Sequence, residues 1–230
     1  MARYYKAINQ IVIIASLLLF TQANAQDPKP GLLEESKLEI LLDEIEETLG
    51  GLTSLRTEFR QEKHLSLFKE PVHAQGILYF AQPKSIRFEI TEPYHSVLIT
   101  NGKSVAQFEH INGRWKKLRS GGTEAIRLVT DQIASWFQGQ LRQENDTYQI
   151  TADAASPTVL HLTPTDEDFA RFVGRIDITL NADRTQIDQI EIHEPTGDFT
   201  RINFESTERD PEVPQRLFKA TGREPATLEE

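Results

Sequence analysis

Apolar and polar residues alternate cleanly along residues 85–91 of the chain. The apolar side of this pattern holds Ile86, Phe88 and Ile90, and the polar side holds Arg87 and Glu89. A period of two predicts a β-strand with one buried face, so we expect the two charged residues to face water. The preceding stretch, residues 77–80, does not alternate. It predicts a strand that carries apolar side chains on both of its faces.

Two other stretches repeat their apolar residues at helical spacing. The first, residues 36–49, opens with a capping box in which Ser36 is the N-cap and Glu39 follows three residues later, and it ends at Gly50-Gly51. The second covers residues 123–140 and follows Gly121-Gly122. The two apolar stripes consist of Leu38, Leu41, Leu42, Ile45 and Leu49, and of Ile126, Val129, Ile133, Trp136 and Phe137. Each stripe must lie on an apolar surface.

Further strands are predicted on both sides of the second helix. They cover residues 55–61, 74–81, 85–91, 96–100, 104–110 and 114–118 before it, and 147–152, 158–163, 171–180, 186–193 and 199–206 after it, with a last short strand at Leu217 and Phe218. Their connections are short, which favours antiparallel pairing. The fold class is therefore mostly β with α: a strongly curved antiparallel sheet whose concave face is covered by amphipathic helices.

The first 25 residues have the three parts of a secretory signal peptide. Arg3 and Lys6 form the positive start, residues 11–20 form an apolar run too short to span a bilayer, and Ala23-Asn24-Ala25 forms the cleavage site. We expect cleavage after Ala25. The remaining chain is then expected to comprise a flexible lead-in over residues 26–35, a single domain over residues 36–220 and a disordered tail over residues 221–230.

The net charge and the absence of cysteine exclude some classes of partner and of membrane attachment. The chain has a formal net charge of −10, and removing residues 1–25, which hold two basic and no acidic side chains, takes it to −12. Such a surface repels nucleic acid, so no nucleic-acid partner is expected. The chain has no cysteine, which excludes disulfides, cysteine ligands and the acylated cysteine of a lipoprotein. We therefore expect the exported product to be free in its compartment.

Candidate catalytic and metal-binding motifs are absent from the sequence. The six histidines are scattered, and there is no His-Glu-x-x-His, Gly-x-Ser-x-Gly or Gly-x-Gly-x-x-Gly pattern. The acidic cluster Asp166-Glu167-Asp168 lacks the spaced ligands and the turn glycine of a calcium loop, and we expect a solvated loop there. We expect no metal, no cofactor and no enzymatic activity. A curved sheet under helices can instead enclose a ligand.

Four segments resemble the outer-membrane lipoprotein carrier family of the LolA type. They are LTSLRTEFRQEKH at residues 52–64, with its Phe-x-Gln at Phe59 and Gln61; GILYFAQPKSIRFEITEP at residues 76–93, which resembles the signature strand pair of the family; SVLITNGKSVAQFE at residues 96–109; and the stretch from VLHLTP to IDQIEIHEPTGDFTRINFES at residues 159–206. The order and spacing of these segments carry the resemblance, which covers residues 38–218.

The resemblance implies an open, incomplete antiparallel barrel whose helices close its mouth as a lid. It also implies a periplasmic carrier, or chaperone, that binds the acyl chains of a lipoprotein or other lipid-like cargo in a hydrophobic cavity and takes it to the outer membrane. The cargo-binding residues expected on this basis are Phe59, Leu78, Phe80, Ile86, Phe88, Ile90, Ile126, Val129, Ile133 and Phe137. In the family an arginine before the signature proline latches the lid. Gln82 holds that position here, without the fixed charge.

The resemblance further implies an inner-membrane donor complex and an outer-membrane acceptor as partners, and we expect a monomer. Two other functions are compatible with the same sequence. One is a periplasmic adaptor that senses mislocalised lipoprotein with this fold and contacts a membrane partner. The other is an enzyme that acts on a lipid, which the missing motifs disfavour.

Overall fold

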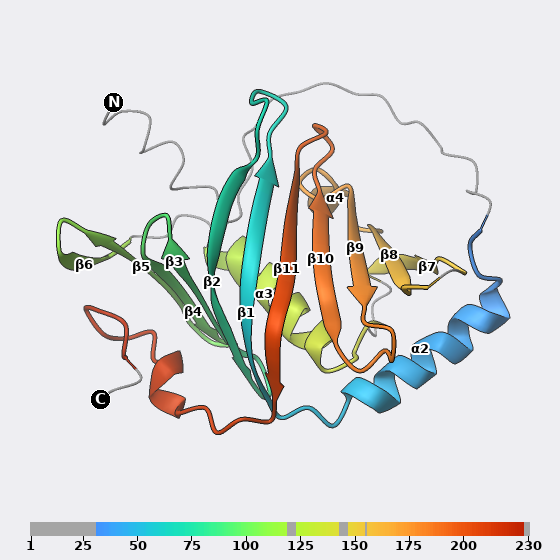
Figure 1. Ribbon diagram of the computed structural model, residues 1–230, viewed down its shortest axis with the longest axis horizontal. Coiled ribbons are helices and arrows are strands. Elements are labelled where there is room, and N and C mark those ends of the chain that lie inside the picture. Colours follow the sequence, from blue (N-terminus) through green and yellow to red (C-terminus); the bar gives the residue numbers. More distant parts are fainter. Residues whose placement is uncertain (1–30, 119–122, 143–146, 155, 228–230) are drawn as a thin grey trace.

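The computed structural model describes residues 31–118, 123–142, 147–154 and 156–227 (Figure 1). The expected signal peptide, the first part of the expected lead-in and Gly121-Gly122 lie outside these residues. The described helices are α2 (Glu35–Leu49), α3 (Thr123–Phe137), α4 (Glu167–Ala170) and the 3-10 helix η1 (Gln215–Phe218). None of the helices in the described ranges is long and apolar enough to cross a membrane.

The described strands form one antiparallel sheet of 11 strands. They are β1 (Ser54–His64), β2 (Val72–Ala81), β3 (Ser85–Glu92), β4 (Ser96–Asn101), β5 (Val105–Ile111), β6 (Arg114–Lys117), β7 (Tyr148–Ala152), β8 (Val159–Pro164), β9 (Arg175–Leu180), β10 (Ile187–His193) and β11 (Phe199–Arg209). Their order is β6-β5-β4-β3-β2-β1-β11-β10-β9-β8-β7. Since β6 and β7 are the two edges and do not pair, the sheet is open and curved, which confirms the predicted fold class.

Helix α3 lies between the two edge strands in the sequence, so the chain crosses from one edge of the sheet to the other through it. In Figure 1 this helix runs across one face of the sheet, behind β2, β1 and β11. The main core lies on this concave face, where the apolar stripes of α2 and α3 meet the inward side chains of eight strands. Leu33, just before α2, also packs there, and its N–H donates to the Ala152 carbonyl oxygen (2.8 Å).

A glycine permits the close approach of β2 and β3 within the signature segment. A Cβ atom on Gly76 would lie 1.8 Å from the Glu89 carbonyl oxygen. The strand register shifts at this point, between Gln75 and Gly76. No other residue fits there without moving the backbone of β3.

The convex face of β2 to β5 carries a second core, which explains the apolar residues on both sides of β2. Its members include Tyr79, Ile99 and Phe108, and they pack against Leu217 and Phe218 of η1. The predicted short strand at Leu217 and Phe218 was wrong, because this segment is a 3-10 helix that covers the sheet instead of joining it.

The prediction that Arg87 and Glu89 face water was also wrong. Arg87 is only 3% exposed. Its guanidinium donates to Glu89 Oε2 from Nε (2.9 Å) and Nη2 (2.7 Å), and Nη1 lies 3.4 Å from the Leu217 carbonyl oxygen. Because η1 covers this part of the convex face, the outward charges of β3 are buried as an ion pair.

Three further local predictions differ from the structure. Helix α2 begins at Glu35 with Glu34 as N-cap and no side-chain cap, so Ser36 lies within the first turn and the capping box does not form. The strand predicted over residues 171–180 begins only at Arg175. Residues 171–174 form the turn after α4. The acidic cluster expected as a loop is instead the start of α4, with Asp166 as the N-cap that accepts a hydrogen bond from the Phe169 N–H (2.8 Å).

Candidate functional site

An apolar cavity of about 330 Å³ lies between α3 and the concave face of the sheet. Strands β1 to β4 and β9 to β11 form its floor, α3 forms one wall, and β7 with α4 closes another side. Its volume lies near the lower end of the range of small-molecule pockets, roughly 300–1,000 Å³. Its lining is dominated by apolar side chains, as in a site for an apolar ligand.

Five of the ten predicted cargo-binding residues line this cavity: Leu78, Ile86, Phe88, Val129 and Ile133. The other five, Phe59, Phe80, Ile90, Ile126 and Phe137, are buried outside its lining. Ring packing accounts for three of these positions, since Phe59 stacks on Phe88 at 4.1 Å and Phe80 lies 6.1 Å from Phe137 between ring centroids. The structure therefore separates the predicted set into cavity wall and fixed core.

Several cavity residues did not appear in the predicted set. Trp136 stood in the predicted apolar stripe of α3, and Tyr148 stood at the start of a predicted strand. Phe169, Phe172 and Val173 come from α4 and the turn after it. Phe172 is 46% exposed although it lines the cavity. The aromatic residues beside the acidic cluster were the one sequence signal that could have located this side of the site.

Charged side chains also contribute to the cavity lining, where β1 and β10 end. Lys63 Nζ lies 3.2 Å from Glu194 Oε1, with both side chains partly buried. Asp166 and Asp168 lie on the α4 side. The apolar interior thus grades into a polar border, as expected for a site whose ligand has an apolar part and a polar part.

Gln82, at the predicted latch position, does not reach the helix that covers the cavity. Its Nε2 donates to the Leu52 carbonyl oxygen (2.8 Å), in the connection between α2 and β1. A different glutamine joins α3 to the signature turn: Gln138 Nε2 donates to the carbonyl oxygens of Pro83 (3.0 Å) and Ala134 (2.8 Å). Gln138 follows α3 directly, so this contact fastens the C-terminal end of the helix.

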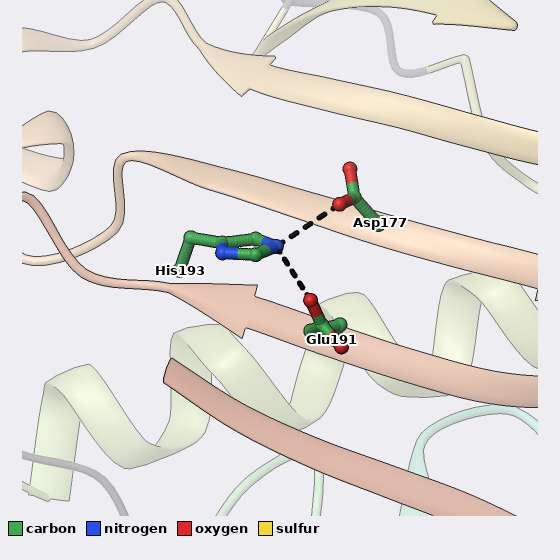
Figure 2. Close-up of side chains that lie close together, drawn as sticks. All are labelled: Asp177, Glu191 and His193. Atoms are coloured by element: carbon green, nitrogen blue, oxygen red, sulfur yellow. Dashed lines mark hydrogen bonds and ion pairs between the residues drawn. The ribbon is translucent and has the colours of Figure 1, made fainter. Parts of the chain in front are cut away.

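Within the described ranges, one group of side chains brings metal-ligating atoms together, on the convex face away from the cavity (Figure 2). His193 Nε2 lies 3.0 Å from both Asp177 Oδ2 and Glu191 Oε1. Arg175 Nη2 lies 2.9 Å from the same Asp177 oxygen and 3.3 Å from His193 Nε2, and Arg201 Nε lies 2.6 Å from Glu191 Oε2. Because guanidinium groups already neutralise both carboxylates, the group is an ion-pair network.

An open curved sheet with an apolar cavity under its helices defines a class of proteins that enclose apolar ligands. The chain belongs to the outer membrane lipoprotein carrier protein LolA family, whose model matches residues 50–221. This confirms the resemblance stated from the sequence.

Relatives share little sequence with the chain. It is 24% identical to an outer-membrane lipoprotein carrier protein of Yersinia enterocolitica over 59% of this chain and 70% of that protein. It is 25% identical to the one from Salmonella paratyphi B over 39% of this chain and 46% of that protein. A solved LolA superfamily protein from Nitrosomonas europaea is 10% identical, with a TM-score of 0.39, and the match covers 79% of this chain and 96% of that one.

Proposed function

We propose that this protein is a periplasmic carrier that binds the acyl chains of a lipoprotein, or of another lipid-like cargo, in the cavity beneath α3 and takes them to the outer membrane. The observation that carries the proposal is the apolar cavity itself, in a chain that belongs to a carrier family. An inner-membrane donor would load the cargo, and an outer-membrane acceptor would receive it.

The mechanism is burial and release of hydrocarbon, without bond chemistry. Each methylene moved from water into the cavity contributes about 0.8 kcal/mol. A cargo with more chain than the cavity accommodates must displace α3 from part of the sheet, which offsets some of this gain. Release then requires an acceptor that offers the chain a better apolar environment, because the carrier alone holds it in preference to water.

Binding is tested by placing a charge in the cavity wall. Ile192 lines the cavity from β10, so Ile192→Glu would force an ionised carboxylate against the bound chain, which is costly. We expect at least a tenfold weaker affinity for a fluorescent fatty-acid probe. Ile40→Glu is the matched control, because Ile40 is 59% exposed on α2. Equal affinities of the two variants would contradict a cargo site in this cavity.

The carrier role is tested in the cell by depleting the protein and fractionating the membranes. We expect acylated lipoproteins to accumulate in the inner membrane, and native mass spectrometry of the protein purified from its periplasm to show a bound acylated species. Unchanged lipoprotein sorting, together with loss of an envelope-stress signal, would contradict transport and support the sensing adaptor.

A further inference from the structure

Three polar atoms in the wall of the cavity have no hydrogen-bond partner in the described part of the chain. They are Trp136 Nε1, Tyr148 OH and Gln132 Oε1, and all three are enclosed. Trp136 is 1% exposed and Tyr148 is 8% exposed. Buried polar groups are almost always paired in native proteins, so unpaired ones at a ligand cavity require an explanation.

The three side chains belong to one side of the cavity. Gln132 and Trp136 are four residues apart on α3 and therefore share a face of the helix. Tyr148 opens β7, and its ring centroid lies 6.2 Å from that of Trp136. All three residues line the cavity, whereas strands β2 to β4 contribute only apolar side chains to it, namely Leu78, Ile86, Phe88 and Leu98. The polar atoms are thus grouped at one location instead of being spread around the wall.

The chemistry of this group indicates what it would bind. An indole N–H only donates, and burial raises the pKa of the Tyr148 phenol, so its hydroxyl stays protonated and donates as well. Hydrocarbon satisfies neither donor. A carbonyl oxygen, with two lone pairs, satisfies both. An acyl chain carries such an oxygen on its first carbon, the carbonyl carbon through which the chain is joined to the rest of the lipid.

We propose that Trp136 and Tyr148 form a polar subsite that donates hydrogen bonds to the carbonyl oxygen of a bound acyl group. This inference rests on the proposed carrier function and names the part of the cargo that is recognised. The subsite selects ester- or amide-linked acyl chains over ether-linked chains of the same length. Because neighbouring side chains cover the donor atoms, the carbonyl reaches them as α3 yields to the entering cargo.

The test compares lipids that differ only in their linkage. Dipalmitoyl glycerol, dihexadecyl glycerol ether and the corresponding dipalmitoyl diamide, all with two sixteen-carbon chains on a three-carbon backbone, are each used to displace a fluorescent fatty-acid probe from the full mature protein. We expect the ester and the amide to displace the probe at roughly tenfold lower concentration than the ether, the order expected for one or two net hydrogen bonds. Equal displacement by ester and ether would overturn the inference.

Variants assign the preference to these residues. Tyr148→Phe and Trp136→Phe each remove one donor, and the double variant should bring the ester-to-ether ratio close to one. Tyr148→Phe should not lower the melting temperature, since it removes an unpaired buried hydroxyl. The matched control Tyr79→Phe lies on the convex face and should keep the wild-type ratio. If the double variant kept the wild-type ester-to-ether ratio, the proposed subsite would be overturned. If the wild-type protein bound no lipid at all, the proposed carrier function would be overturned as well.

Discussion

At the scale of single residues, burial on the convex face decides which charged side chains contribute to the stability of the fold. Arg87 was expected to be a solvated residue, and the structure places it beneath η1 in contact with Glu89. Glu89 also accepts from His95 Nε2 (2.7 Å). The pair therefore depends on a segment that lies about 130 residues away in the sequence and that no local pattern reveals.

Arg87→Glu should be strongly destabilising, because it would place two carboxylates together in a buried site. Loss of one partner from a buried ion pair costs about 3–5 kcal/mol. The control is Arg60→Glu, at an exposed ion pair with Glu205, where the expected loss is below about 1 kcal/mol. Urea denaturation of the two variants measures both values. Similar, small losses would mean that Arg87 is not buried in solution.

His161 should make stability depend on pH. Its Nδ1 lies 2.7 Å from Asp177 Oδ1 and its Nε2 lies 3.3 Å from Asp153 Oδ1. The hydrogen bond with Asp177 raises the pKa of His161 and outweighs the opposing effect of burial. For Asp177, burial opposes ionisation, but the hydrogen bond with His161 and the charge of Arg175 outweigh it and lower the pKa, so this carboxylate stays ionised throughout the neutral range.

A histidine whose pKa is higher in the folded than in the unfolded state stabilises the fold at pH values below its unfolded-state pKa of about 6.5. This stabilisation is lost as the pH rises through the folded-state pKa. The melting temperature should therefore fall as the pH rises above about 6.5 and passes through the raised pKa of His161. His161→Gln should make this dependence shallower, whereas His110→Gln, at an exposed position, should leave it unchanged. An identical slope in wild type and His161→Gln would refute the assignment.

At the scale of elements, η1 acts as the cover of the second core. Leu217→Ala should lower the free energy of unfolding by about 2–5 kcal/mol, because a buried leucine is truncated in a packed cluster. Leu67→Ala, at a residue that is 91% exposed, should change it by less than about 0.5 kcal/mol. Fatty-acid probe titration should give the wild-type affinity for Leu217→Ala, since the cavity lies on the other face of the sheet. A large loss of affinity would mean that the two faces are coupled.

Periodicity located the main helices and each of the 11 described strands, because the spacing of apolar residues reports which face of an element is buried. It did not report what covers that face. Phe80 and Ile86 point to the same side of the sheet, yet only Ile86 lines the cavity, since Phe137 packs on Phe80. The alternation that runs from Phe172 to Leu180 also extended the predicted strand into the turn after α4, which hid Phe172 from the predicted site.

At the scale of the whole molecule, one open sheet separates two cores of different character. On the convex face, η1 rests directly on the strands. On the concave face, α2 packs on solid core, whereas α3 spans the space between the edge strands with a cavity beneath it. Helix α3 joins the two edges and has the cavity beneath it, so under the proposed carrier function it is the element that cargo would displace.

Hydrogen exchange should distinguish the two helices. The stripe of α2 is buried throughout, whereas Val129 of α3 is half-buried and faces the cavity with Ile133. Amide exchange followed by mass spectrometry should show faster exchange in α3 than in α2 for the lipid-free protein, because local opening is easiest where few apolar contacts hold an element. A saturating fatty-acid probe should slow exchange in α3 several-fold and leave α2 nearly unchanged, since only α3 gains a new apolar surface beneath it. Equal exchange in the two helices, unaffected by the probe, would make α3 a fixed part of the core and would leave the carrier without a movable wall.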